Sequence, residues 1–583
     1  MFKGHPKGLY ALALSNTGER FGYYTMLAVF ALFLRENFGL EAGTAGAIYS
    51  TFLGLVYFMP LIGGVMADKF GFGKMVTIGI SIMFVGYMLL SFPLGGDMIA
   101  MIAMMAALLF ISLGTGLFKG NLQVMVGDLY NDPKYADKRD SGFSLFYMAI
   151  NVGSLFAPTT AVGIKNWAQN DLGYSSNDAY HFAFAVACVA LVVSIIIYYA
   201  FRSTFRHVEG GKKNGAAAAQ VNDTLTPAET KQRIVALCLV FAVVIFFWMA
   251  FHQNGLTLTY FADEFTNTTA FGFDTMLFDV WNLVMLIVAV YATFSIFQST
   301  SAKGKLTSGV LATGILAFLV YRAFGAEGTE LAVSAPIFQQ FNPFYVVALT
   351  PVSMAIFGSL AKSGKEPSAP RKIAYGMLVA AIGFAIMAVG SQGLNTPNDQ
   401  ARAIAVNKAE TIAKATLEAS DEASAKAAEK AKSDFEGKLT KENKEVFETV
   451  YNASMVTMSA DSDQAQVAAA NAELEAIKAD TKEETRTSPY WLIFTYLILT
   501  FAELLLSPMG ISFVSKVAPP KLKGLMMGGW FVATAIGNML VAVGGFLWAG
   551  IPLWSVWAVF ISLCLLSALF MFIMMKRLES VTK

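Results

Sequence analysis

Hydrophobic residues fill long stretches of this chain, and short polar segments separate one stretch from the next. Apolar runs of about twenty residues recur along the whole length, which is what an α-helix needs to cross the hydrocarbon core of a bilayer. The pattern predicts fourteen membrane-spanning helices, at residues 8–34, 43–67, 75–95, 98–127, 142–163, 181–201, 233–260, 277–297, 306–325, 336–361, 373–393, 489–515, 523–549 and 552–576. Because fourteen is even, both termini are predicted to lie on the same side.

The composition agrees with this pattern. Hydrophobic residues make up 56% of the 583 residues, and charged residues make up only 14%. Cys188, Cys238 and Cys564 lie within predicted spans, so they indicate no disulfide framework. The first span is too long for a cleavable signal and lacks a small-residue cleavage site. We expect an all-α, multi-pass protein of the cell membrane that contacts the lipid bilayer and binds no nucleic acid.

Basic residues predict the orientation of the chain, because loops with an excess of lysine and arginine stay in the cytoplasm. They fall in alternate loops, at Lys69 and Lys74, at Lys134, Lys138 and Arg139, at Arg202, Arg206, Lys212 and Lys213, at Lys303 and Lys305, at Lys362, Lys365, Arg371 and Lys372, and at Lys516, Lys521 and Lys523. The opposite loops are poor in basic residues. Both termini are therefore predicted to be cytoplasmic.

One long polar segment, residues 394–488, interrupts the series of spans and is predicted to lie outside the cytoplasm. It holds 12 lysine and arginine residues against 18 aspartate and glutamate residues, and strong helix formers dominate it. Few apolar positions recur within it, so two or three exposed helices forming a hairpin are expected. The sequence leaves two roles open: a solvated appendage, or a module that binds an extracytoplasmic partner or delivers peptides.

Glu19 and Arg20 stand side by side within the first span. A charge at membrane depth costs roughly 2.5 to 3.5 kcal/mol on insertion scales, so we expect a chain that keeps two of them there to need them for its function. Helical spacing puts Asn16, Arg20 and Tyr23 or Tyr24 on one face, which points toward protein or water. A simple brace between helices is the alternative for this pair.

Further polar and aromatic groups occur singly in other spans, which favours a shared central cavity. They are Tyr57, Lys119, Asn121, Tyr147, Asn151, Trp248, His252, Asn342, Glu503, Ser507, Trp530 and Asn538. Lys119 and Glu503 are the lone charges of their spans, so we expect them to pair across the bundle. No nucleotide-binding loop, nucleophile elbow or cluster of metal ligands is found, so the sequence indicates no enzyme, no metal site and no cofactor.

Several motifs resemble those of one family. The loop Gly64-Val-Met-Ala-Asp68-Lys69 resembles the major facilitator loop, in which Asp68 and Lys69 would latch the cytoplasmic face. Gly18 to Tyr24 resembles the ExxERFxYY motif of the proton-dependent oligopeptide transporter (POT) family, and Phe146 to Leu155 matches its FYxxINxGS signature. Further matches are Lys119 with Asn121, Phe338 to Pro343, Pro367 to Gly376, and Glu503 to Pro508 with Trp530.

This resemblance implies a major facilitator fold with twelve core helices in two six-helix bundles, plus two extra helices. The implied N-terminal bundle covers residues 1–202, the cytoplasmic linker 203–230 and the C-terminal bundle 231–583. The C-terminal bundle would contain the extra hairpin 277–325, between core helices 7 and 8, and the insert 394–488, between core helices 9 and 10.

The resemblance also implies proton-coupled uptake of di- and tripeptides by alternating access. Arg20 and Lys119 would face the peptide carboxylate, and Glu503, helped by Asn151 and Asn342, would face its amino group. The remaining implied binding residues are Tyr23, Tyr24, Tyr57, Tyr147, Trp248, Ser507 and Trp530. Two opposed charge clusters suit any dipeptide, because each one carries a carboxylate and an ammonium group at a nearly fixed separation.

Three positions depart from the family pattern: Asn16 replaces a glutamate, Leu27 a basic residue and His252 an acid. The last two normally pair across the extracytoplasmic gate, so we expect that gate to close through apolar and hydrogen-bonding contacts. Protons are the expected coupling ion, carried by Glu19, Glu503 and a titrating His252. Two alternatives remain: a relative that carries nitrate, amino acids or another small metabolite, and a transport-inactive sensor or assembly component.

Overall fold

The computed structural model describes residues 4–210, 225–459 and 462–581. Long helices dominate it. They are α1 Lys7–Phe38, α2 Ala42–Phe70, α3 Phe72–Leu90, α4 Met98–Asp128, α5 Arg139–Asn170, α6 Ser176–Ala200, α7 Pro227–Phe251, α8 Thr257–Glu264, α10 Val280–Gln298, α11 Ala302–Gly325, α12 Phe341–Lys362, α13 Ala369–Gly390, α18 Tyr490–Val517, α19 Lys523–Met539, α20 Ala542–Trp548 and α21 Leu553–Ser580. The remaining helices, α14 to α17, form the insert, and α9 is a single turn, Thr275–Phe278.

Thirteen helical segments of the described chain are long and apolar enough to cross a membrane. They match the predicted spans other than the first. That span is the 32-residue helix α1, which packs against α5 and α6 inside the protein. Ser15, Asn16, Glu19, Arg20 and Thr25 in its middle are buried, so α1 relies on protein contacts and not on an apolar surface.

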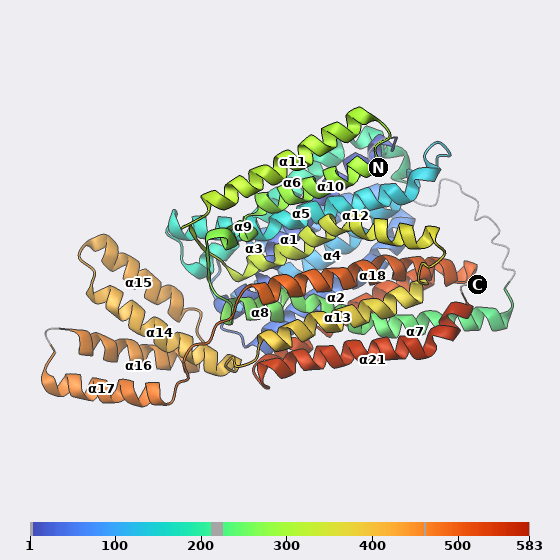
Figure 1. Cartoon of the computed structure of the whole chain (residues 1–583). Helices are drawn as coiled ribbons and strands as arrows, with labels where there is room; N and C mark the ends of the chain where they lie inside the picture. The colour runs from blue at the N-terminus through green and yellow to red at the C-terminus, as the bar shows by residue number, and fades with distance from the viewer. Residues whose placement is uncertain (1–3, 211–224, 460–461, 582–583) are drawn as a thin grey trace.

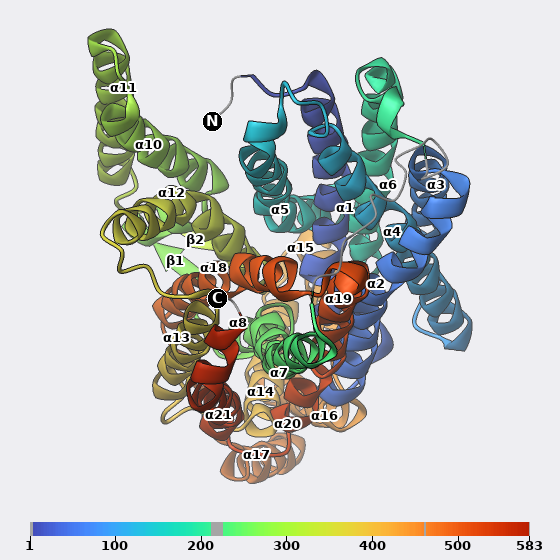
Figure 2. The same cartoon turned by 90° about the vertical axis from the view of Figure 1, so that its right-hand side faces the viewer.

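The helices form two groups (Figure 2). Helices α1 to α6 pack together as the N half, and α7, α12, α13, α18, α19 and α21 form the C half. In the extra hairpin, α10 packs on α12 and also contacts α5, and α11 lies at the outer edge of the molecule. A two-stranded antiparallel ladder, β1 Thr269–Phe271 with β2 Glu330–Ala332, joins the chain on either side of this hairpin and puts Ala270 opposite Leu331.

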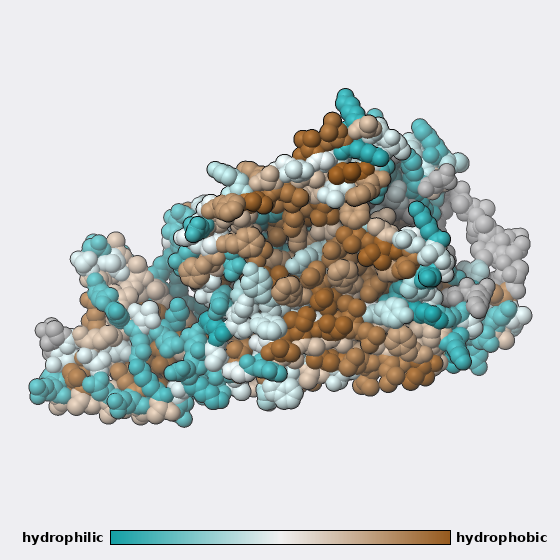
Figure 3. All heavy atoms as spheres, in the orientation of Figure 1, coloured by the Kyte–Doolittle hydropathy of each residue, from teal (hydrophilic) through white to brown (hydrophobic). Residues whose placement is uncertain are grey.

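The insert lies at one end of the bundle, and the described ends of the chain lie toward the other (Figure 1). We call these ends the insert side and the termini side. The space-filling view shows apolar side chains across the middle of the molecule and polar side chains at the insert and at the termini side (Figure 3). This distribution is what a bilayer around the middle of the helices requires.

The insert holds four helices, so the expected two or three were too few. They are α14 Pro397–Leu417, α15 Glu422–Glu436, α16 Lys441–Met458 and α17 Gln464–Ala479. Side-chain caps at Thr396, Asp421, Thr440 and Asp463 begin the four helices. Phe447, Val450 and Ala409 belong to a small core of the insert's own. The sparse apolar positions concealed this core in the sequence.

Two predicted spans are broken near the insert side. Residues 233–260 form α7, then the short 3₁₀ turn His252–Gly255, then α8. Gly255 allows the break to pack closely, since a Cβ there would lie 2.0 Å from the Tyr49 hydroxyl. The span 523–549 likewise divides into α19 and α20. The predicted linker 203–230 lies partly outside the described residues, but Glu209 O accepts a hydrogen bond from Gly73 N at the start of α3.

Candidate functional site

Glu19 and Arg20 form a bidentate ion pair within α1. Arg20 Nε lies 2.5 Å from Glu19 Oε2, and Nη2 lies 2.6 Å from Oε1. Both side chains are almost completely buried. The Arg20 guanidinium also lies 4.6 Å from the centre of the Tyr23 ring. Each charge therefore has its partner inside one helix, and protonation of Glu19 would release Arg20 for another anion.

Lys119 on α4 contacts an aromatic ring and not a carboxylate. Its Nζ lies 4.0 Å from the centre of the Tyr57 ring on α2, a cation–π contact. The expected pairing of Lys119 with Glu503 is wrong for this structure, because each of the two groups contacts a nearer partner. An ammonium that packs against a ring retains its capacity to bind an anion.

Glu503 lies on α18 and belongs to the opposite half. Asn342 Nδ2, near the start of α12, donates to Glu503 Oε2 over 3.0 Å and to Thr500 Oγ1 over 3.0 Å. The Glu503 residue is 9% exposed. The sequence prediction that Asn342 helps Glu503 agrees with this contact, although the role of the pair in binding stays a prediction.

Aromatic side chains connect the two halves between these charges. His252 stacks on Trp248, with ring centres 5.3 Å apart and planes at 25°, and its ring lies 6.1 Å from that of Tyr57. Three buried polar atoms here have no hydrogen-bond partner in the described structure: Tyr23 Oη, Trp248 Nε1 and His252 Nε2. Buried polar atoms without a partner are costly, and a polar ligand would satisfy them.

Tyr24 and Tyr57 interact electrostatically with both Arg20 and Glu503, so the predicted carboxylate-binding and amine-binding charges share one region. Tyr147 on α5 is 48% exposed and hydrogen bonds to Ser507 of the other half. The Asn151 side chain does not reach the other half through this bond, because its Nδ2 donates to the Tyr147 carbonyl one turn earlier in the same helix.

Trp530 and the predicted latch residues, Asp68 and Lys69, lie in two further parts of the structure. Trp530 is buried against Phe241, and a Cβ on Gly510 would lie 1.9 Å from its ring, so glycine is needed there. Asp68 and Lys69 lie at the termini-side end of α2, just before Gly71 with its positive φ of 93°. The two residues are thus far along α2 from Tyr57.

At the insert side, Arg35 of α1 and Glu264 of α8 form an ion pair between the halves. Trp548 Nε1 donates to Glu264 Oε2 over 3.0 Å, and the Arg35 guanidinium lies 4.7 Å from the centre of the Tyr260 ring. The sequence did not predict this pair. In the sequence, Arg35 and Glu264 lie just beyond the ends of two predicted spans. Charges at such positions are ordinarily interpreted as residues that flank a span.

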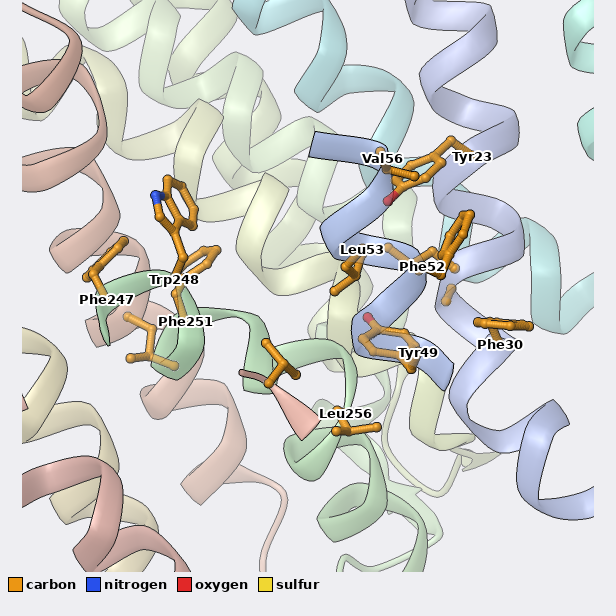
Figure 4. Close-up of a cluster of buried hydrophobic side chains, with 14 of the residues drawn as sticks. Tyr23, Phe30, Tyr49, Phe52, Leu53, Val56, Phe247, Trp248, Phe251 and Leu256 are labelled. Atoms are coloured by element: carbon orange, nitrogen blue, oxygen red, sulfur yellow. The ribbon is translucent and has the colours of Figure 1, made fainter. Parts of the chain in front are cut away.

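Apolar and neutral polar contacts accompany the ion pair, as expected from the sequence. Gln339 Nε2 donates to the Ala28 carbonyl, and Thr159 Oγ1 donates to Gln340 Oε1. Figure 4 shows buried side chains of α1, α2 and α7 near this region, including Tyr49 of α2, and Leu256 just before α8. The prediction that apolar and hydrogen-bonding contacts close this end was incomplete, because Arg35 and Glu264 add an ion pair nearer the helix ends than Leu27 and His252.

A family model described as the POT family matches residues 73–226, 322–412 and 453–546, which is more than half of the chain. The chain belongs to the POT family. Residues 227–321, which contain most of the extra hairpin, and 413–452, in the middle of the insert, lie between the matched segments. This POT protein is therefore a membrane transporter of a family with peptide transporters among its members.

Three bacterial relatives match this chain over nearly its whole length. An uncharacterized transporter of Bacillus subtilis, YclF, is 27% identical and the match covers 94% of this chain and 90% of that protein. The peptide transporter YePEPT of Yersinia enterocolitica is 26% identical, with coverages of 93% and 88%. The dipeptide and tripeptide permease A of Escherichia coli is 23% identical, with coverages of 93% and 83%.

Solved structures of the family share the fold. A crystal structure of a peptide transporter POT in complex with sulfate superposes with a TM-score of 0.65 at 21% identity, covering 100% of this chain and 96% of that one. A POT family transporter in complex with 5-aminolevulinic acid gives a TM-score of 0.65 at 18% identity, with coverages of 100% and 98%. These matches confirm the predicted major facilitator fold.

Proposed function

We propose that this POT protein carries di- and tripeptides into the cell together with protons, by alternating access. One observation carries the proposal: Arg20 and Lys119 on one half and Glu503 on the other carry opposite charges, and Tyr57, whose ring contacts Lys119, interacts electrostatically with both Arg20 and Glu503. A dipeptide has a carboxylate and an ammonium group at its two ends. It would bind the first group of charges through one end and the second through the other.

Relatives named as peptide transporters support the substrate class. The E. coli relative is named a dipeptide and tripeptide permease, and the Lactococcus lactis relative a di-/tripeptide transporter, which is 26% identical to this chain. The orphan polar atoms of Tyr23, Trp248 and His252 would contact the peptide backbone or side chains, with Tyr147, Asn151, Ser507 and Trp530 around them.

Proton coupling would use the carboxylates that hold cations or amides. A proton on Glu19 would remove the partner of Arg20, and a proton on Glu503 would weaken its bond with Asn342. A proton on His252 would place a second positive charge beside the Tyr57 ring that Lys119 contacts. One proton moving down a potential of 100 mV supplies roughly 2.3 kcal/mol, enough for about a fiftyfold solute gradient.

The proposed orientation puts the termini side in the cytoplasm and the insert side outside. Lys69 and Lys74 flank the α2–α3 connection at the termini side, and the positive-inside rule assigns such loops to the cytoplasm. With this orientation, the ion pair of Arg35 and Glu264 closes the extracytoplasmic end, and the present structure is closed toward the outside.

Counterflow in liposomes tests the substrate class. Liposomes preloaded with dialanine should exchange labelled dialanine, and external alanine or nitrate should not compete. Competition by alanine or nitrate without competition by dialanine would favour the alternative of a family member for another small solute. The absence of exchange with any of these solutes would favour a transport-inactive component.

A further inference from the structure

The insert contacts both halves of the transporter at the insert side. Its root is fixed to the C half. Gln400 Nε2 donates to the Glu264 carbonyl over 2.9 Å, and Arg486 Nη1 donates to the Thr266 carbonyl over 2.7 Å. Thr487 and Phe265 add a backbone hydrogen bond of 2.7 Å. The insert therefore begins and ends on the segment that carries the gate residue Glu264.

Helix α15 of the insert docks on the N half. Asp434 Oδ1 accepts from the Ser176 backbone N–H over 2.9 Å, and its Oδ2 accepts from Gln169 Nε2 over 3.1 Å. Ser176 is the first residue of α6, where the N–H groups lack helical partners and the helix dipole favours a carboxylate. Lys430 Nζ donates to the Gln169 carbonyl over 2.5 Å. One helix of the insert therefore forms hydrogen bonds with the end of α5 and the start of α6.

The third contact reaches α1, close to the gate. Lys438 Nζ, just after α15, lies 3.3 Å from Glu36 Oε2. Lys165 Nζ lies 3.6 Å from the same oxygen, and Tyr180 Oη donates to it over 2.8 Å. Burial lowers the pKa of Lys438, but the nearby Glu36 and Asp263 carboxylates outweigh this and raise it. Lys438 is therefore charged at neutral pH and remains paired with Glu36, the neighbour of Arg35.

Helix α15 is itself attached firmly to the rest of the insert. Phe435 packs on Phe447 with ring centres 5.3 Å apart, and Lys432 Nζ lies 4.2 Å from the centre of the Tyr451 ring. A force on α15 is therefore transmitted through the insert core to the root on the C half. The two halves cannot separate at this end while both the root and α15 keep their contacts.

We propose that the insert is a strap that holds the insert side of the transporter closed. Its docking face is formed by Lys430, Asp434 and Lys438, and the partner is the N half of the same chain at Gln169, Ser176 and Glu36. Opening toward the insert side requires release of this face, so the strap sets the population of the state open on that side. The proposal of a strap rests on alternating access, which is part of the proposed function.

A reversible cross-link tests the strap. An ideal Cβ on Gly437 lies 3.3 Å from Asn177 Nδ2 at the start of α6, so cysteines at Gly437→Cys and Asn177→Cys lie within reach of a short, reducible bifunctional thiol reagent. In a Cys238→Ser background, cross-linking should stop dialanine uptake and reductant should restore it. The two single-cysteine variants serve as controls. Failure of the bridge to form, or full uptake by the bridged protein, would overturn the proposal.

Weakened docking provides a second, independent readout. Asp434→Ala with Lys438→Ala should raise the population open at the insert side about fivefold, as expected for partly exposed polar contacts. Spin labels at Leu94→Cys on the N half and Trp554→Cys on the C half report this population as a longer distance. Lys426→Ala, which removes an exposed pair with Glu422 on the same helix, is the matched control.

The two proposals can fail separately. Label distances that do not change in the docking variant would overturn the strap, even if dialanine uptake is normal. Distances that respond as expected in a protein that exchanges no peptide would support the strap and contradict the proposed substrate. Normal dialanine uptake by the two single-cysteine controls verifies that neither substitution alone disturbs the protein.

Discussion

Arg35 on α1 and Glu264 on α8 form an ion pair that joins the two halves of the transporter near their insert-side ends. The resemblance to the family predicts a charged pair at the positions of Leu27 and His252, which lie farther from the helix ends than Arg35 and Glu264. The halves are therefore still joined by charge, at a different depth. Trp548 and Tyr260 surround the pair, so it is shielded from solvent more than a surface salt bridge would be.

Removal of one partner of this pair should impair transport more than removal of both. Arg35→Leu or Glu264→Leu leaves a largely buried charge without its partner, which costs on the order of a few kcal/mol and opens the insert side. The double variant strands no charge. Initial uptake rates of the four proteins should give a double-mutant cycle with positive coupling, and additive losses would contradict an energetic role for the pair.

Glu19→Gln should abolish uphill accumulation and spare counterflow exchange. The amide keeps the size of the side chain but cannot take up and release the proton, and Arg20 loses its charged partner. Uptake of dialanine against a gradient is compared with exchange at equal concentrations on both sides. Retained accumulation would remove Glu19 from the coupling mechanism.

Glu503→Gln should reduce peptide binding strongly, while Asn342→Ala should reduce it about tenfold. The carboxylate is expected to hold the peptide ammonium directly, whereas Asn342 orients that carboxylate over 3.0 Å. Binding is measured by competition for counterflow. A matched control is an N-acetylated dialanine, which lacks the ammonium group and should lose little affinity in Glu503→Gln. Equal affinity of the variant and the native protein for free dialanine would contradict the assignment.

His252→Gln should shift the pH dependence of uptake, because the glutamine side chain cannot carry the proton that is proposed for His252. The stack on Trp248 accommodates a flat amide, so folding should be preserved. Uptake is recorded between pH 5.5 and 8 at a constant pH difference across the membrane. A pH profile that coincides with that of the native protein would make His252 a structural residue.

The sequence predicted the spans and the family with little error, because twenty-residue apolar runs and the motifs around Glu19, Tyr147 and Glu503 are local features. It could not predict which charges meet. Arg35 and Glu264 are 229 positions apart, and only the packing of α1 against α8 brings them together. The partner of Lys119 could not be predicted for the same reason. Helical periodicity indicates which face of its helix Lys119 lies on, but not that this face packs against Tyr57 of α2.

Local helix breaks and the insert were predicted less well. The turn at His252–Gly255 depends on the close approach of Tyr49 to Gly255, a contact from the other half that no local propensity encodes. The four helices of the insert are amphipathic only around a small core that includes Phe447 and Val450. Docking of Asp434 on the first residue of α6 depends on distant geometry in the same way.

Dialanine uptake into proteoliposomes with an imposed pH gradient tests the central claim most directly. The account predicts accumulation above the external concentration when the outside is acidic, with accumulation lost on addition of a protonophore. Proton entry should rise when dialanine is added. Uptake that merely equilibrates regardless of the pH gradient, or no proton entry with dialanine, would contradict proton-coupled peptide transport by this protein.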